Sequence, residues 1–335
     1  MKKTVAIIYG GEGKERGVSK RSAEALFSLI DKEKYEALPI FISEVGGWFV
    51  PGKDPFGKLP TAAAKPTYPV RVLGKSGFLV GEKIIEADIA IPVLHGDFGE
   101  DGVIQGALDA AHIRYIGSGT VASAVCIDKY ITKLVALSLG IPTARALLFK
   151  DESAEAALKA AEEKVGFPLF IKPTSLGSSI GASRVRTKED FYKAYALARS
   201  YGRVLVEELL PVKYEVECAY FCDGEREIFC PLGIIDTNGE PYDFDKKYRT
   251  EGTARVSGTY PDCAGEIIDY SRRLCHAIGL RHIGRIDFLV TDSGGVYFNE
   301  INTIPGMTET SLYPRLTEGA VGRDFINALL DAVLL

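Results

Sequence analysis

Four polar residues near the end of the chain, Arg285, Asp287, Glu300 and Asn302, lie on either side of a turn-forming stretch, DSGG at 292–295. If the flanking runs are antiparallel strands joined by an even-length loop centred on this stretch, Asp287 lies opposite Glu300. Arg285 then lies opposite Asn302, and all four side chains share one face, because side chains alternate along a strand. Facing carboxylates repel, so the pattern favours cations between them, and oxygen ligands without a nearby His or thiolate suit Mg²⁺ that carries nucleotide phosphates. A solvated hairpin with ordinary surface charges is the alternative.

The length and composition limit the class of protein. A chain of 335 residues exceeds the size that one hydrophobic core usually supports, so we expect two or three domains. A formal net charge of -5 gives no electrostatic reason to expect a nucleic-acid partner or a membrane surface. Six cysteines without CxxC spacing are typical of buried thiols in a reducing cytosol. No apolar run is long enough for a membrane span, and the short run after MKK predicts a buried strand rather than a signal peptide, so we expect a cytoplasmic protein.

The order of predicted elements indicates an α/β fold that becomes α+β toward the C-terminal part. In the first third, strands and helices alternate, which favours a parallel sheet. The expected elements there are strands at 5–9, 37–42 and 89–94, helices at 19–30 and 102–111, and a peripheral hairpin and loop within 43–85. A helix over 122–139 is expected to begin a middle domain, followed by a strand at 147–150, a helix at 154–165 and strands at 168–172, 204–207, 215–221 and 229–235.

Two segments carry possible nucleotide-binding groups. Lys172 ends the apolar run PLFIK and is followed by the small-residue loop GSSIG at 177–181, which can offer N–H groups and hydroxyls to a phosphate. No GxxxxGK[ST] motif is present, and a lysine that only caps a strand end is the alternative. The run VLVEELL at 204–210 can present acceptors to an adenine amino group, with Leu210 against the ring and Glu215 near the ribose. Acids after a strand are common, so this run indicates little by itself.

Seven segments in combination resemble the signatures of D-alanine:D-alanine ligases, a family of the ATP-grasp superfamily. They are GGEGKERGVS (10–19), HGDFGEDGVIQG (95–106), IDKYITK (127–133), IKPTSLGSSIG (171–181), YDFDKKY (242–248), GRIDFLV (284–290) and NEINTIPGMT (299–308). The resemblance spans nearly the whole chain. It implies an ATP-grasp fold in three domains, at 1–120, 121–206 and 207–335, with the nucleotide between the middle and C-terminal domains.

The resemblance also implies a reaction. ATP phosphorylates the carboxylate of a first D-alanine, and the amine of a second D-alanine attacks the acylphosphate to give a dipeptide for peptidoglycan precursor synthesis. Because amide formation in water is uphill, the carboxylate must be activated and the intermediate shielded from hydrolysis. The implied cofactors are ATP and two Mg²⁺ ions, which Mn²⁺ can replace. The implied partners are D-alanine, ATP and a second copy of the chain in a homodimer through the first domain, with no nucleic acid and no membrane.

Each role is carried over to a matching position. The implied catalytic groups are Glu15, Ser178, Tyr248, Arg285 and the N–H of Gly306. The implied ATP-binding residues are Lys129, Lys172, Ser179, Glu207, Glu208, Leu210, Glu215, Lys247, Phe288 and Asn299. The implied substrate-binding residues are Glu15, His95, Ser311 and Leu312, and Glu100 is a further candidate for orienting substrate. The implied metal ligands are Asp287, Glu300 and Asn302.

A lid and the choice of second substrate follow from the same resemblance. Residues 242–255 are rich in Lys, Arg, Gly and Thr, which is typical of a mobile lid and also of a solvated loop, and the Lys247-Tyr248 match favours the lid. Tyr248 and Leu312 favour D-alanine as the second substrate. Two other functions remain open: a D-alanine:D-serine ligase of the same family, and a nucleotide-binding regulator that does not ligate. A regulator that does not ligate would be expected to lack metal-binding or oxyanion residues, and all of these residues are present.

Overall fold

The computed structural model describes most of the chain. The described residues are 2–13, 15–51, 55–57, 70–73, 77–80, 82–177, 179–236, 254–257, 259–308, 310–322 and 324–334. Ser178, and the predicted lid up to residue 253 with Lys247 and Tyr248, lie outside them. No helix within these described ranges is long and apolar enough to cross a membrane.

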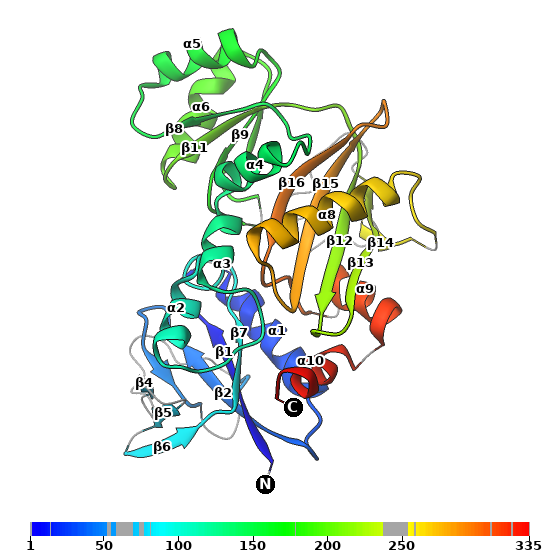
Figure 1. The fold of residues 1–335 in the computed structure, drawn as a ribbon. Helices are drawn as coiled ribbons and strands as arrows, with labels where there is room; N and C mark the ends of the chain where they lie inside the picture. The colour runs from blue at the N-terminus through cyan, green and yellow to red at the C-terminus, as the bar shows by residue number, and fades with distance from the viewer. Residues whose placement is uncertain are drawn as a thin grey trace.

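A mainly parallel sheet forms the first part of the molecule (Figure 1). Its elements are β1 (Lys3–Gly10), α1 (Arg16–Leu29), β2 (Tyr35–Ile42), β3 (Trp48–Phe49), β7 (Ile89–Val93) and α2 (Val103–Ala110). The strand order is β3-β2-β1-β7, with β1 parallel to both β2 and β7, which confirms the predicted parallel sheet. Strand β1 is apolar and buried along nearly its whole length because helices cover a parallel sheet on both faces. Region 43–85 also holds a small antiparallel sheet of β4 (Val70–Leu73), β5 (Gly77–Val80) and β6 (Lys83–Glu86).

A second, antiparallel sheet lies at the opposite end of the molecule (Figure 1). It consists of β8 (Ala146–Phe149), β9 (Leu169–Pro173), β10 (Ser183–Val185) and β11 (Val204–Glu208), covered by α5 (Ala154–Lys164) and α6 (Lys188–Arg199). Leu169 and Ile171 pack in the core with both helices. Because side chains alternate, Phe170 and Lys172 point to the other face of the sheet. Hydrophobic alternation on β9 therefore orients Lys172 away from the helices.

The third sheet is antiparallel and carries the acidic hairpin. Its strands are β12 (Val212–Cys222), β13 (Glu227–Asp236), β14 (Ala254–Val256), β15 (Ile283–Thr291) and β16 (Val296–Asn302), in the order β14-β13-β12-β15-β16. Helix α8 (Ala264–Ile278) covers one face, and Ile286, Phe288 and Val290 pack in the core with it. The alternate residues Arg285, Asp287 and Leu289 consequently face the opposite side.

The predicted helix over 122–139 is wrong in one respect, since it is two helices, α3 (Thr120–Ile127) and α4 (Lys129–Ser138). Asp128 separates them in an extended conformation and caps α4 by accepting the N–H groups of Tyr130 (3.1 Å) and Ile131 (3.2 Å). Cys126 of α3 and Ala136 of α4 pack in the core of the third sheet. Both helices therefore pack beneath the acidic hairpin.

The C-terminal helix returns to the first sheet. Helices α9 (Leu312–Val321) and α10 (Phe325–Leu334) follow β16, and Figure 1 shows α10 beside α1. Leu329 is fully buried in a core shared with β1 and α1. The N–H of Asp31 donates to Asn327 Oδ1 (3.0 Å), and Lys34 pairs with Asp331 (2.8 Å). The proposed limits at 1–120, 121–206 and 207–335 stay a prediction, and α10 shows that the last segment contributes to the first core.

Leu329→Ala tests this packing. We expect a loss of about 2–5 kcal/mol in the free energy of unfolding, because the substitution leaves a cavity in a close-packed core. The single tryptophan, Trp48, is in β3 of the same sheet, so its fluorescence during urea unfolding measures the effect. Leu137→Ala on α4 makes the same chemical change at a side chain that is 56% exposed, and should change stability by less than about 0.5 kcal/mol. Equal losses in the two variants would contradict the assignment of α10 to this core.

Candidate active site

Two cavities adjoin above the third sheet. The larger, of about 1050 Å³ with its open mouth included, lies between the middle and third sheets. The smaller, of about 770 Å³, is bounded by the first and third sheets. Gly177, Glu217 and Glu300 line both cavities, so a ligand in one can contact a ligand in the other.

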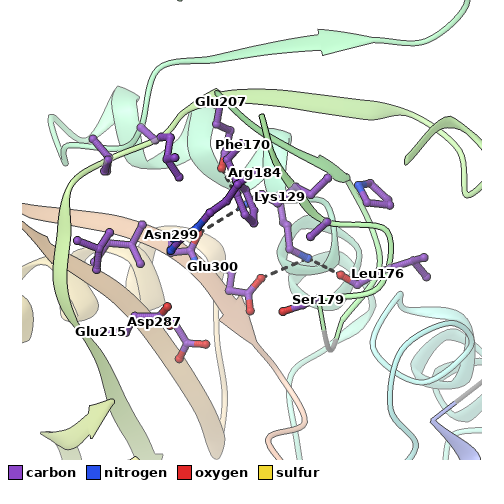
Figure 2. Close-up of a pocket in the computed structure, with 18 of the residues that line it drawn as sticks. Lys129, Phe170, Leu176, Ser179, Arg184, Glu207, Glu215, Asp287, Asn299 and Glu300 are labelled. Atoms are coloured by element: carbon purple, nitrogen blue, oxygen red, sulfur yellow. Dashed lines mark hydrogen bonds and ion pairs between the residues drawn. The ribbon is translucent and has the colours of Figure 1, made fainter. Parts of the chain in front are cut away.

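The larger cavity collects most of the residues predicted to bind ATP (Figure 2). Lining it are Lys129, Lys172, Ser179, Glu207, Glu208, Leu210, Glu215 and Asn299, together with Asp287 and Glu300. The structure thus brings together segments from β9, β11, β12, β15 and β16, which are spread over residues 169–302. Phe170, Arg184 and Leu289 also line the cavity, although the sequence analysis did not select them. Alternation from Lys172 would have identified Phe170, whereas Arg184 is placed opposite Phe170 by the β9–β10 register.

Buried lysines give this cavity a positive wall. The Glu207 carboxylate lies between the ammonium groups of Lys133 (3.0 Å) and Lys172 (2.9 Å). Although burial alone raises the pKa of Glu207, these two cations hold that pKa below its ordinary value. Lys172 also contacts Asn299 Oδ1 at 3.3 Å. One carboxylate shared by two ammonium groups leaves a net positive charge, which suits a phosphate.

Lys129 connects this wall to the acidic hairpin. Its ammonium group donates to the carbonyl oxygen of Leu176 (2.8 Å) and lies 3.3 Å from Glu300 Oε2, as Figure 2 shows. The N-terminal end of α4 therefore holds the loop after β9 against β16. Lys133, one turn further along α4, was not selected from the sequence, and its spacing of four from Lys129 was the available signal.

The predicted pairing of the hairpin is confirmed, but for a different reason. Asp287 pairs with Glu300, and Arg285 pairs with Asn302. The loop is odd in length, however, since Val290 pairs with Val296 and Gly294 adopts a positive φ of 84°. A β-bulge that inserts Asn299 into β16 shifts the register by one residue and restores the predicted partners.

The hairpin belongs to a row of three acids across adjacent strands. Glu217 of β12 pairs with Asp287 of β15, which pairs with Glu300 of β16. Arg285 binds Asp287 through two hydrogen bonds, Nε to Oδ1 (2.8 Å) and Nη2 to Oδ2 (2.7 Å), and its Nε lies 3.4 Å from Glu217 Oε2. Burial raises the pKa of Asp287 to about 7, and the neighbouring acids Glu217 and Glu300 add to the shift while Arg285 opposes it. Glu217 was missed, although the Glu-x-Glu alternation from Glu215 placed it on the same face.

The donor set at this row fits a hard cation that brings its own phosphate ligands. Asp287 and Glu300 offer carboxylate oxygens, and the Asn302 amide lies 3.1 Å from Asp287. In the part of the chain that the structure describes, no group of three or more His, Cys, Asp or Glu residues is placed to hold a metal. Mg²⁺ typically takes one or two carboxylates and completes its octahedral shell with water and phosphate oxygens. A bound cation would favour the ionised form of Asp287, whose pKa is raised.

The smaller cavity collects the predicted substrate and oxyanion residues. Its lining includes Glu15, His95, Arg285, Asn302, Gly306, Ser311 and Leu312, and also Glu100. Glu15 lies so close to two glycines that a Cβ at Gly96 would be 2.8 Å, and one at Gly177 3.2 Å, from its carboxylate. A Cβ at Gly306 would be 2.8 Å from Ser311 Oγ. Glycines therefore permit the close approach of these three segments.

Phe288 is a correction to the predicted ATP-binding set. Its ring is fully buried and packs against Phe298 with centroids 6.1 Å apart, in the core beneath α8. Asp287 faces the cavity, and adjacent residues on a strand point to opposite faces, so Phe288 cannot share that cavity. Leu289, two residues after Asp287, lines the cavity in its place.

The fold and the site together define an enzyme of the ATP-grasp class, with a cavity between two sheets above a row of acids. Two family models match the chain, described as D-ala D-ala ligase N-terminus over residues 4–118 and D-ala D-ala ligase C-terminus over residues 135–333. The chain therefore belongs to the D-alanine–D-alanine ligase family and is an ATP-using ligase.

Similar proteins cover the whole chain. A D-alanine–D-alanine ligase from Thermoanaerobacter sp. (strain X514) is 34% identical over 350 residues, covering 99% of this chain and 96% of the relative. One from Corynebacterium jeikeium is 36% identical over 369 residues, covering 99% and 97%. The crystal structure of the VanG D-Ala:D-Ser ligase from Enterococcus faecalis has a TM-score of 0.87 at 32% identity, covering 99% of each chain. The D-alanine-D-alanine ligase from Coxiella burnetii has a TM-score of 0.85 at 27% identity, covering 99% and 94%.

Paired variants of adjacent residues test the assignment of faces on β15. Leu289→Ala should weaken ATP binding about tenfold, because it removes apolar contact worth roughly 1–2 kcal/mol without opening the core. Phe288→Ala should instead lower the free energy of unfolding by about 3–5 kcal/mol. Calorimetric ATP titration and urea unfolding of both variants measure the two effects. Weaker ATP binding by folded Phe288→Ala, with normal binding by Leu289→Ala, would reverse the assignment.

Proposed function

We propose that this ligase joins two molecules of D-alanine to D-alanyl-D-alanine for peptidoglycan precursor synthesis, and converts ATP to ADP and phosphate. The observation that carries the proposal is the meeting of the two cavities at Gly177, Glu217 and Glu300. A phosphate wall of buried lysines on one side adjoins a carboxylate, a guanidinium and a glycine N–H on the other. This arrangement suits transfer of a phosphoryl group from a nucleotide to a small amino acid.

In this proposal the chain acts mainly by positioning and electrostatics. Glu15 holds the ammonium group of the first D-alanine, and Lys129 and Lys172 hold phosphate oxygens. Arg285 and the Gly306 N–H stabilise negative charge on the carbonyl oxygen when the second amine attacks the acylphosphate. Mg²⁺, as two ions that Mn²⁺ can replace, would be held by Asp287, Glu300 and Asn302 and would neutralise phosphate charge during transfer. Ser178, Tyr248 and Lys247 keep the roles that the resemblance implies, in segments outside the described residues.

The second substrate is proposed to be D-alanine. Leu312 is buried at the start of α9 and presents an apolar side chain to the smaller cavity, which suits a methyl group. A second candidate is D-serine, favoured by the likeness to the VanG D-Ala:D-Ser ligase and by the hydroxyl of Ser311, which lies 2.8 Å from Thr308 Oγ1. A cytoplasmic homodimer formed through the first domain completes the proposal and rests on the family resemblance.

Product analysis tests the proposed function. With ATP, Mg²⁺ and D-alanine alone, we expect ADP release that depends on D-alanine and equals the dialanine formed. Addition of equimolar D-serine should leave dialanine as the main product, because Leu312 offers the second side chain no polar partner. A predominance of D-alanyl-D-serine would favour the second candidate. ADP release that is independent of any D-amino acid would favour a nucleotide-binding regulator.

The raised pKa of Asp287 predicts a pH dependence of nucleotide binding. Only the ionised carboxylate binds a cation, and with a pKa of about 7 the ionised fraction rises from about one tenth at pH 6 to about nine tenths at pH 8. The apparent affinity for a non-hydrolysable ATP analogue with Mg²⁺ should therefore fall about tenfold as the pH is lowered from 8 to 6. Asp287→Asn removes the titrating group and should give weaker binding with a nearly flat pH profile. An unchanged profile in this variant would assign the titration to another group.

A further inference from the structure

Ser22 makes two hydrogen bonds outside its own helix. This side chain is fully buried in α1, and its Oγ accepts the N–H of Met307 at 3.2 Å. The same Oγ lies 3.1 Å from His95 Nε2. Met307 is 285 positions away in the sequence, so these contacts join the first sheet to the segment after β16.

The hydrogen-bond partners of His95 establish the direction of this contact. His95 Nδ1 lies 3.1 Å from the carbonyl oxygen of Ile304, which can only accept, so Nδ1 carries the proton. Burial lowers the pKa of His95, which favours the neutral ring. Nε2 is then an acceptor, and the Ser22 hydroxyl donates to it. Both ring nitrogens of His95 are thus occupied by the protein, although His95 lines the smaller cavity.

Glu100 holds the same segment from a second point. Its Oε1 accepts the N–H of Ile304 at 3.3 Å, and its Oε2 accepts the N–H of Gly96 at 2.9 Å. The N–H and the C=O of Ile304 and the N–H of Met307 are therefore all bound by side chains of the first domain. Gly306 lies between these anchored residues. We call residues 304–307 the oxyanion loop, after the proposed role of the Gly306 N–H.

Helix α1 presents one face to the active site. Glu15 and Val18 line the smaller cavity, and Ser22 contacts the oxyanion loop beside it. Their spacing of i, i+3 and i+7 places all three on the same side of the helix. Helix α1 therefore has two roles in the site. The carboxylate at its start is offered to the substrate ammonium group, and Ser22, two turns further along the helix, fixes the oxyanion loop.

We propose that Ser22 is a positioning residue of the ligation reaction, and that His95 acts through Ser22 and Ile304 to fix the oxyanion loop and not by contact with substrate. The inference rests on the proposed role of Gly306. A donor stabilises an oxyanion only if it is already aimed when charge develops, and loss of one such donor reduces turnover by roughly 10²–10³-fold. Removal of a hydrogen bond that aims the donor should have a smaller effect in the same direction.

Ser22→Ala is the primary test, with Ser19→Ala as its matched control. Ser19 is equally buried on α1, but its hydroxyl accepts the Gly10 N–H (2.8 Å) and donates to Val93 within the first sheet. We expect Ser22→Ala to lower kcat about 10- to 100-fold with little change in KM for ATP or D-alanine. Its affinity for a phosphinate analogue of the tetrahedral intermediate should fall by the same factor. Ser19→Ala should reduce stability comparably and keep the affinity for the analogue in its folded fraction.

A double-mutant cycle with His95→Gln separates the two roles of the histidine. If His95 acts through the oxyanion loop, the Ser22→Ala/His95→Gln enzyme should lose no more turnover than the worse single variant. If His95 contacts substrate, its variant should raise KM for D-alanine, and the two effects should multiply, which would overturn the proposal. Should Ser22→Ala not fold, Ser22→Cys keeps a side chain that can form a weaker hydrogen bond and should show a smaller loss of the same kind.

The outcomes distinguish this inference from the proposed function. A wild-type enzyme that forms no ADP with D-alanine would refute the function itself. An active wild type with fully active Ser22→Ala would overturn only the positioning role. A fall in kcat without loss of affinity for the analogue would also overturn it, because the oxyanion loop would then not be the affected part.

Discussion

The buried row of acids on β12, β15 and β16 is the constraint on which the rest of the structure depends. Glu217, Asp287 and Glu300 lie on adjacent strands with one guanidinium, Arg285, between them. Burial and the neighbouring acids oppose ionisation of these carboxylates, as the pKa of about 7 for Asp287 indicates. The core beneath α8 fixes the positions of these acids. Because neighbouring side chains on a strand point to opposite faces, burial of Ile286 on one face places the acids on the other. Binding of cations and phosphates therefore stabilises this site by offsetting the repulsion between its acids.

Both cavities are lined by more acids than cations, so their cations act locally, beside particular acids. Beside the larger cavity, Glu207 pairs with both Lys133 and Lys172, so two lysines share one carboxylate at the place proposed for phosphates. In the smaller cavity, the Glu15 carboxylate lies close to Gly96 and Gly177, where a side chain would meet it. The groups are thus placed before the ligands bind, which is the main requirement of a reaction that depends on orientation and charge stabilisation.

The first sheet and its helices are joined to the proposed active site by contacts at long sequence separation. Helix α10 packs in the core of the first sheet and is anchored to Asp31 and Lys34. Ser22, His95 and Glu100 bind the backbone of the oxyanion loop from the same side. Two independent sets of contacts therefore fix the first domain relative to the acidic hairpin. Both the proposed ammonium site at Glu15 and the oxyanion loop depend on this alignment.

The sequence by itself determined most of the longer strands and the family, because these depend on local apolar patterns and on motifs that are contiguous in the chain. The sequence predicted that Asp287 faces Glu300, but for the wrong reason. The turn residues are evident in the sequence, whereas the bulge at Asn299, which produces this pairing, has no comparably clear local signal. The family resemblance placed Phe288 among the ATP-binding residues, whereas strand alternation from Asp287 places its ring in the core. Only the tertiary structure placed Ser22 against Met307 and both nitrogens of His95 against protein groups. A serine within a helix looks the same in sequence whatever it contacts, and its partners here are brought to it by the packing of separate domains.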